Sequence, residues 1–430
     1  MKKSLQKLLV ISFIITVLVG ITTPVTSLID VDSPIYTASP IYATSSIDVA
    51  SQVDAVSPID ASSPGNIVSP ATVKSDFHLG YQLGDGSPLA PTPPESFESI
   101  DPDYPYNQDD QSSTEIIFPD YTTLNPLTGL PMNPHLTWQR PIAVSVSNAT
   151  PALPMNGISQ ADIMIEMLVE SGVTRMLALY QDIGSAGVIG SIRSARHYTA
   201  CIAESFDAIL VSAGGSPQAY DHIRSRRIAH IDETAGRHSQ MFRRDVNRIS
   251  GRTVGRYHSA ITTGELASRW LPEFNVRLAR TTDNFSSLFF VDDGTPENGG
   301  SAGEVVVRFA RQNHSTFTFN YASGTYTMRQ SQGQFIDAND YSQPQFTNLL
   351  ILRTSISTIP GDIYGRLNIG TVGRGSGYFV CGGRFIEISW YRPDATLPFI
   401  FAHRDGTLLT LGRGNTYIAI IPDNMSVSFE

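Results

Sequence analysis

The alternation of hydrophobic and polar residues is clearest in the middle of the chain. Residues 162–170 alternate, with apolar side chains on one face and acidic ones on the other, as expected for a half-buried strand. The acidic positions are Asp162, Glu166 and Glu170. Ser171-Gly172 then supplies a turn, and residues 173–181 return as an equally apolar partner. The pattern therefore predicts a β-hairpin.

A helix and another strand are expected after this hairpin. A glycine-rich loop precedes residues 193–206, whose apolar positions have helical spacing, and residues 207–213 form the next apolar run. Gly214-Gly215-Ser216-Pro217 follows, in which the serine suits a helix N-cap and the proline the first helical position. Two helix N-termini thus follow glycine turns, and each would offer free backbone N–H groups to an anion.

The order of these elements predicts the fold class. Strands and helices alternate over residues 121–284, which indicates an α/β domain with a mixed sheet. A glycine-rich, acidic stretch at residues 285–303 marks the expected boundary. Residues 300–430 read almost entirely as strands, with hairpin turns expected at Gly382-Gly383 and Asp405-Gly406. The expected fold is an α/β domain followed by a mostly antiparallel β domain.

The first 120 residues have no globular pattern. Lysines precede an uncharged run at residues 8–21, so residues 1–27 are expected to be a secretory signal peptide or, alternatively, an uncleaved membrane anchor. Residues 28–120 repeat Ser-Pro and Ile-Asp units and carry 15 acidic residues against Lys74 alone, a net charge of −14. Such a segment cannot close a core and is expected to be a disordered spacer.

The remaining chain is balanced in charge, because residues 121–430 contain 26 arginines, 25 acidic residues and no lysine. Nine of these arginines fall between Arg224 and Arg256 against three acidic residues, a local net charge of +6. This basic segment could bind a phosphate-rich polymer, a lipid head group or nucleic acid, or be a solvated arm folded over acidic faces. Nucleic acid is not expected, since few aromatic residues interleave the arginines in an exported chain.

The sequence predicts no cofactor and no metal site. Only Cys201 and Cys381 are present, and both are interpreted as buried free thiols, with a disulfide between them as the alternative. There is no His-Glu-x-x-His motif. The glycine loop after the hairpin has neither the Gly-Lys-Ser/Thr of a P-loop nor the spacing of a dinucleotide fingerprint.

The sharpest binding hypothesis concerns Arg193 and Arg196. They stand three residues apart at the start of the predicted helix, so both guanidinium groups could reach one anion, together with the amides of Gly214, Gly215 and Ser216. The structural alternative is that the arginines pair with the hairpin carboxylates. A catalytic hypothesis uses Glu166 or Asp162 as the acid/base of a wall-acting hydrolase, with His197 or His258 assisting.

Several motifs together resemble the YerB-like lipoprotein family of Gram-positive bacteria. They are Asn125-Pro126-Leu127-Thr128-Gly129, Arg140-Pro141-Ile142-Ala143-Val144, Ala161-Asp162-Ile163, Glu166-Met167-Leu168-Val169-Glu170, Ile189-Gly190-Ser191-Ile192-Arg193-Ser194-Ala195-Arg196 and Ala213-Gly214-Gly215-Ser216-Pro217. The resemblance covers about residues 125–425 and implies an N-terminal domain, a β-rich C-terminal domain and an extracytoplasmic, membrane-tethered protein. It implies no catalytic residues.

The chain departs from the family pattern at three serines and at its N-terminus. Ser191 replaces the usual proline, Ser212 a histidine and Ser259 an asparagine, and the lipid-carrying cysteine is absent. The favoured function is an exported envelope protein that binds an anionic small molecule, a wall polymer or a protein partner, with membrane contact only through its N-terminal segment. A wall-acting hydrolase and a structural tether are the alternatives.

Overall fold

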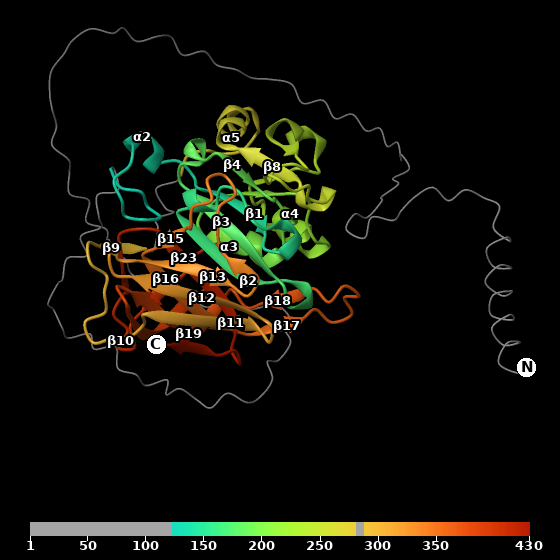
Figure 1. The fold of residues 1–430 in the computed structure, drawn as a ribbon. Coiled ribbons are helices and arrows are strands. Elements are labelled where there is room, and N and C mark those ends of the chain that lie inside the picture. The colour runs from blue at the N-terminus through green and yellow to red at the C-terminus, as the bar shows by residue number, and fades with distance from the viewer. Residues whose placement is uncertain (1–122, 281–287) are drawn as a thin grey trace, which may run out of the picture. The chain divides into compact units, whose positions relative to one another are not determined.

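The structure is a computed structural model that describes residues 123–280 and 288–430. The predicted signal peptide (1–27) and spacer (28–120) lie outside the described residues. Strands dominate the described part and helices are few (Figure 1). Among these residues, no helix combines the length and the apolar character needed to span a membrane.

The largest sheet has eleven strands, in the order β10-β20-β19-β16-β23-β2-β3-β1-β5-β6, with β21 paired to β20. Their bounds are β1 (Ile142–Ser147), β2 (Ile163–Leu168), β3 (Thr174–Tyr180), β5 (Ile209–Ser212), β6 (His230–Asp232), β10 (Gly300–Ser301), β16 (Asn348–Thr354), β19 (Gly373–Cys381), β20 (Arg384–Arg392), β21 (Ile400–Ala402) and β23 (Thr416–Pro422).

Both predicted segments, 121–284 and 300–430, contribute to this sheet. β2 pairs in parallel with β23, in register from Ile163 opposite Thr416 to Met167 opposite Ile420. In Figure 1, β2 and β3 of the first segment lie beside β23 and β16 of the second. β23 is also parallel to β16, and β1, β5 and β6 are parallel neighbours, so the sheet is mixed.

Smaller sheets surround the large one. A six-stranded antiparallel sheet consists of β11 (Glu304–Ala310), β12 (Asn313–Asn320), β13 (Thr325–Gln330), β14 (Gly333–Gln334), β15 (Gln345–Phe346) and β24 (Val427–Phe429). The others are β4 (Val188–Gly190) with β8 (Ala260–Thr263) and β7 (Arg243–Arg244), β9 (Phe289–Val291) with β22 (Thr410–Gly412), and β17 (Ile356–Thr358) with β18 (Leu367–Ile369).

The described helices are short. The α-helices are α2 (Pro134–Thr137), α3 (His197–Ser205), α4 (Pro217–Arg226) and α5 (Gly264–Trp270). The 3-10 helices are η1 (Thr150–Ala152), η2 (Ile158–Gln160), η3 (Glu170–Gly172), η4 (Ile183–Ser185), η5 (Gly236–Met241), η6 (Arg256–His258) and η7 (Leu271–Glu273). Ser216 caps α4 as predicted, because its Oγ accepts from Ala219 N at 3.1 Å.

The predicted hairpin of β2 and β3 is confirmed, with Ile163 opposite Leu179. The prediction that one face of β2 is solvated is wrong, because all six of its residues are buried. Met164 packs with residues of the six-stranded sheet, whereas Ile165 packs with residues of α3 and α4. The large sheet therefore has a covered face on each side, and no face of β2 is left for water.

One other local prediction is corrected. The helix expected over residues 193–206 begins at His197, and Arg193 and Arg196 precede it. The hairpin turn expected at Asp405-Gly406 is confirmed, because Ala402 pairs antiparallel with Leu408 and His403 N donates to Thr407 O at 2.8 Å. The Gly382-Gly383 turn joins the paired strands β19 and β20.

Candidate functional site

The residues predicted to bind an anion lie where the parallel strands β1 and β5 end. The segment before α3 runs beside the segment before α4, because Ala195 N donates to Gly214 O at 2.9 Å and Ser216 N donates to Ala195 O at 3.0 Å. Loops at the carboxyl ends of parallel strands are the usual place for ligand sites in α/β sheets. The fold therefore brings the predicted residues together.

Arg196 is buried and paired with a carboxylate. Its Nε lies 2.7 Å from Glu170 Oε1 and its Nη2 lies 3.0 Å from Glu170 Oε2, a two-pronged contact. Although partial burial opposes the charged form of Glu170, the hydrogen bonds and charge of Arg196 bring the pKa of Glu170 below its ordinary value. The structural alternative, pairing with a hairpin carboxylate, thus describes Arg196.

Arg193 is only partly buried, and its Nη1 donates to Tyr257 O at 2.8 Å. Because the helix begins four residues later, Arg193 and Arg196 are not stacked on one helical turn as predicted. The helix-start amides are also partly occupied: Arg196 N donates to Thr199 Oγ1 at 2.8 Å, and Ser216 caps α4. The expectation of freely available amides is therefore wrong in part.

Sequence reasoning missed Arg175, which lies near both predicted arginines. It is 7% exposed, and the one hydrogen bond of its side chain within the described residues runs from Nη1 to Ser194 O, at 2.5 Å. No carboxylate of the described residues comes within ion-pair distance of it. Burial, followed by the charges of Arg196 and Arg193, lowers the pKa of Arg175 well below its ordinary value.

One signal in the sequence could have identified Arg175. It is the single charged residue of the otherwise apolar strand β3, opposite Ser147 of β1 and Met167 of β2. A guanidinium inside a central strand is unusual, because desolvating an unpaired charge is costly. We call Arg175, Arg193 and Arg196, with residues 214–216, the arginine face.

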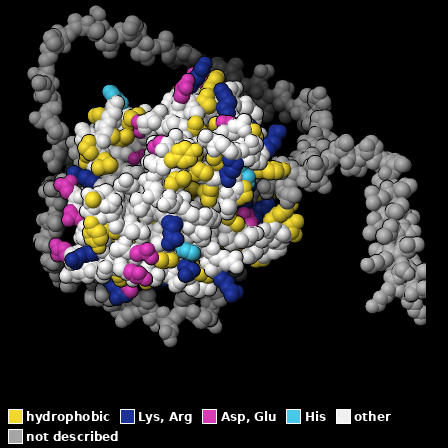
Figure 2. Space-filling view, in the orientation of Figure 1, with side chains coloured by type: hydrophobic (Ala, Val, Ile, Leu, Met, Phe, Trp, Pro, Cys, Tyr) yellow, Lys and Arg dark blue, Asp and Glu magenta, His cyan; other side chains and the backbone are white. Residues whose placement is uncertain are grey.

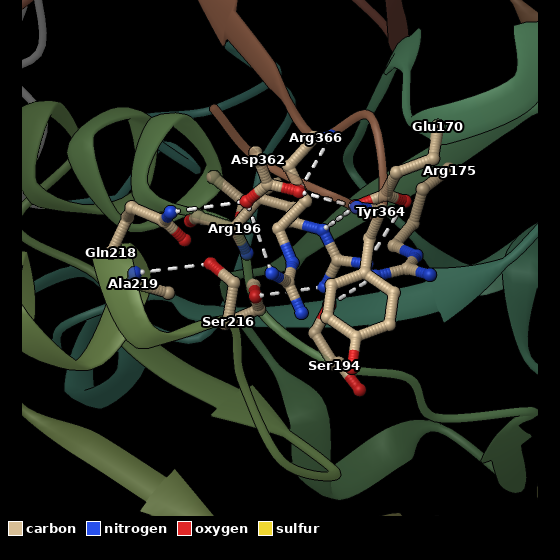
Figure 3. Close-up of polar contacts among 12 residues, drawn as sticks. Glu170, Arg175, Ser194, Arg196, Ser216, Gln218, Ala219, Asp362, Tyr364 and Arg366 are labelled. Carbon is tan, nitrogen blue, oxygen red and sulfur yellow. Dashed lines mark hydrogen bonds and ion pairs between the residues drawn. The ribbon is translucent and has the colours of Figure 1, made fainter. Parts of the chain in front are cut away.

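The hairpin β17–β18 brings a third group of polar residues to this part of the molecule. Asp362, in its loop, accepts from Arg366 Nη1 at 3.1 Å and from Gln218 Nε2 of α4 at 3.3 Å. The Arg366 guanidinium lies 4.5 Å from the ring centre of Tyr364. Figure 3 shows this loop in one view with Arg175, Arg196 and Ser216.

The four catalytic candidates are not gathered into one site. Glu166 is completely buried, and its carboxylate accepts from Asn148 Nδ2 at 2.9 Å, Thr174 Oγ1 at 2.5 Å, Ser315 Oγ at 3.1 Å and the Tyr417 hydroxyl. Burial, only partly offset by these bonds, raises the pKa of Glu166. Because Ser315 and Tyr417 belong to the second segment, the carboxylate links the two segments and has no exposed surface for a substrate.

Asp162 lies at the opposite end of β2 from Glu170. It accepts from Asn125 Nδ2 at 2.7 Å and from Gln181 N at 2.6 Å, and burial raises its pKa to about 6. His197 Nε2 lies 3.1 Å from Asn368 Oδ1, and burial lowers the pKa of His197. Burial and the charge of Arg193 lower the pKa of His258. Both histidines therefore lie near the arginine face, whereas the two carboxylates do not.

The basic segment 224–256 is not one free patch. Arg226 pairs with Glu204 at 2.7 Å, and Arg244 pairs with Glu233 at 2.6 Å. Arg248 is buried and donates to Pro154 O at 3.0 Å and Asn156 Oδ1 at 2.8 Å. On the face drawn in Figure 2, dark-blue side chains are scattered among hydrophobic and acidic ones. The arginines of this segment therefore form ion pairs and hydrogen bonds within the protein as well as contributing positive charge to its surface.

No group of three or more histidine, cysteine or acidic side chains in the described residues is placed to hold a metal ion. Cys201 and Cys381 are buried and not bonded to each other. The guanidinium of the fully buried Arg392 donates to Cys201 O at 2.7 Å and to Thr371 O at 3.1 Å. These contacts belong to the packing of α3 against the second segment.

Comparisons with known proteins identify relatives over most of the described chain. Two domains described as "Protein of unknown function (DUF3048)", an N-terminal and a C-terminal one, match residues 127–264 and 305–418. The protein "Putative lipoprotein YerB" of Bacillus subtilis (strain 168) is 29% identical over 301 residues, which cover 69% of this chain and 86% of that protein. The crystal structure of YerB from Bacillus subtilis matches with a TM-score of 0.60 at 27% identity, covering 71% of this chain and 99% of that one.

Proposed function

Because the chain belongs to the YerB-like family and carries both of its domains in order, we propose that it is an exported cell-envelope protein that binds an anionic ligand at the arginine face. The envelope location follows from the description of its relative as a lipoprotein and from the signal-like residues 1–27. The family name carries no activity, so the binding function is argued from the residues alone.

The observation that carries the proposal is the state of Arg175. Its guanidinium is almost fully buried, donates to one carbonyl oxygen and has no carboxylate partner among the described residues. The positive charges of Arg196 and Arg193 disfavour the charged form of Arg175, and the charge of Glu170, which already pairs with Arg196, favours it only in part. A buried cation without a directly paired carboxylate is costly to keep, and an incoming phosphate or carboxylate would lower that cost. The arginine face therefore has the positive charge that an anion site needs, and the Arg175 guanidinium donates to only one protein oxygen in the described chain.

Titration calorimetry with inorganic phosphate tests this proposal. We expect the wild-type chain to bind phosphate and the Arg175→Met variant to lose at least tenfold in affinity, because methionine keeps an unbranched apolar stem but has no guanidinium. Arg329→Met, which removes an exposed arginine of β13, is the matched control and should bind as the wild type does. Equal affinities of the wild type and Arg175→Met would contradict the proposal.

A further inference from the structure

A cavity of about 910 Å³ beside β6, a fully buried Arg392 and a cavity beside the arginine face are the features that the proposed function leaves unexplained. The first is lined by arginines that mostly pair internally, such as Arg226 with Glu204 and Arg277 with Asp207. Arg392 is satisfied by carbonyl oxygens. The cavity beside the arginine face differs, because one of its lining residues, Gln218, has a buried amide oxygen without a partner in the described chain.

This third cavity, of about 550 Å³, lies between α3 and α4 on one side and the hairpin β17–β18 on the other. That volume is within the range of about 300–1,000 Å³ that is usual for small-molecule sites. Its lining includes His197, Gln218 and His222 and, from the second segment, Ser357, Ile359 and Asn368. His197 follows Arg196 directly, and Gln218 stands two residues after Ser216, so residues of the cavity and of the arginine face are near neighbours on the same two chain segments.

Two buried polar atoms of the cavity residues lack a hydrogen-bond partner in the described part of the chain. They are Gln218 Oε1, which is an acceptor only, and His222 Nε2, which makes no hydrogen bond but lies 3.8 Å from Glu204 Oε2. Gln218 Oε1 is therefore the atom that bears on a ligand. The amide nitrogen of Gln218 is already used by Asp362, at 3.3 Å, so its oxygen remains for a donor from outside the protein. Buried polar groups are normally satisfied, and an exception beside a cavity indicates a ligand that supplies the missing bond.

The remaining lining narrows the class of ligand. Ile359 and Pro360 present apolar surface, His197 presents a ring, and the neighbouring loop carries Tyr364, which is 46% exposed and has Arg366 against its ring. A molecule that fits must therefore combine hydroxyl or amide donors with C–H faces, and it must carry an acid group for the adjoining arginines. A sugar ring that bears a phosphate or a carboxylate has these properties together.

We propose that the ligand of the arginine face is an anionic saccharide, whose acid group binds at Arg175 and whose ring occupies the cavity between α3, α4 and the β17–β18 hairpin. This inference rests on the proposed function, because it assigns the acid group to the same arginine face. It adds that the second segment completes the site, since Ser357, Ile359, Pro360 and Asn368 come from it.

The test compares N-acetylglucosamine 1-phosphate with inorganic phosphate on the purified full-length chain. We expect the sugar phosphate to bind at least tenfold more tightly than phosphate. Ser357→Trp places a bulky ring in the cavity from an exposed strand, and it should abolish this difference while leaving the affinity for phosphate unchanged. Thr358→Trp is the matched control, because the next residue of the strand points to the opposite face and does not line the cavity.

The outcomes separate this inference from the proposed function. If phosphate itself does not bind, the proposed function fails and the inference fails with it. If phosphate binds but the sugar phosphate gains nothing, or Ser357→Trp leaves the gain intact, the saccharide inference alone is overturned. A competition experiment identifies the source of the saccharide, with a purified wall polymer of sugar-phosphate repeats as the competitor. If the polymer displaces bound N-acetylglucosamine 1-phosphate at a lower concentration of repeat units than the free sugar phosphate needs, the ligand is a polymer unit. If the polymer does not displace it, the ligand is the soluble sugar phosphate.

Discussion

At the scale of single residues, two arginines of the same face are held in opposite ways. Arg196 has Glu170 as a two-pronged partner, whereas Arg175 has only the Ser194 carbonyl oxygen in the described structure. Removing one member of a partly buried pair leaves an uncompensated charge, but removing an unpaired buried charge relieves a desolvation cost. The two residues therefore differ in what their loss does to folding.

This difference predicts the stability of two methionine variants. We expect Arg196→Met to lower the free energy of unfolding by about 1–3 kcal/mol, less than for a fully enclosed pair because Glu170 keeps contact with water. The free energy of unfolding of Arg175→Met should be no lower than that of the wild type, although the variant loses ligand binding. Urea titrations followed by circular dichroism measure both, and a large loss of stability in Arg175→Met would mean that this arginine is structural.

His230 predicts a pH dependence of stability. Burial lowers its pKa to about 4, and its Nε2 lies 2.8 Å from Ser212 Oγ. Because the folded pKa is below the unfolded value, the unfolded chain binds more protons between about pH 4 and 6.5, so stability falls as the pH is lowered through this range, by at most about 1.4 kcal/mol per pH unit. The pKa of Asp162 is raised in the folded chain, so its contribution to stability increases as the pH is lowered, opposite to that of His230.

The comparison of the wild type with His230→Gln isolates this contribution, because glutamine does not titrate and the effect of Asp162 is common to both chains. We expect the difference in unfolding free energy between the two proteins to change between pH 6.5 and pH 4 in favour of the variant. Urea titrations at a series of pH values measure it. A constant difference would show that His230 is not held in its neutral form.

At the scale of elements, the start of α4 depends on one side chain. Ser216 is 2% exposed, and its Oγ accepts from Ala219 N. Loss of a serine cap costs about 1 kcal/mol, whereas glycine at the same position costs only a few tenths. Ser216→Ala should therefore lower the unfolding free energy by about 1 kcal/mol and Ser216→Gly by clearly less. Equal losses in urea titrations would mean that packing, and not capping, sets the value of this serine.

The hairpin β17–β18 shows why elements distant in sequence matter for the site. Asp362 is bound by Gln218 of α4, and Asn368 lies against His197 at the start of α3. The loop thus contacts the two helices that directly follow Arg196 and Ser216 of the arginine face. No periodicity within residues 356–369 could indicate this docking, because it depends on which elements the large sheet brings together.

At the scale of the whole described molecule, the shared sheet predicts joint folding of the two segments. β23 lies between β16 and β2, and Glu166 of β2 is bound by Ser315 and Tyr417. A separate chain of residues 300–430 would expose one edge of β23 and leave those hydroxyls without the carboxylate. We expect each segment alone to lack a cooperative thermal transition and the full chain to show a single one. Calorimetry of the three chains measures this, and independent transitions would establish two autonomous domains.

The sequence by itself determined the local elements, because they depend on neighbouring residues. The alternation of residues 162–170 and the Ser171-Gly172 turn predict the hairpin of β2 and β3, and Ser216-Pro217 predicts the start of α4. The family motifs likewise identify the chain from short stretches. In each case the signal and the structure lie within a few residues of one another, so a pattern of polarity and turn residues is sufficient.

Only the tertiary structure decided which of these charged residues are buried, paired or available. The sequence pattern places Glu166 on a solvated face, yet the side chain is buried and bound by Ser315 of the six-stranded sheet. Arg196 forms an ion pair with Glu170, which is 26 residues away in the sequence. Arg175 has no such carboxylate partner in the described chain. Burial and pairing depend on contacts between distant segments, and one sequence contains no record of which strands become neighbours.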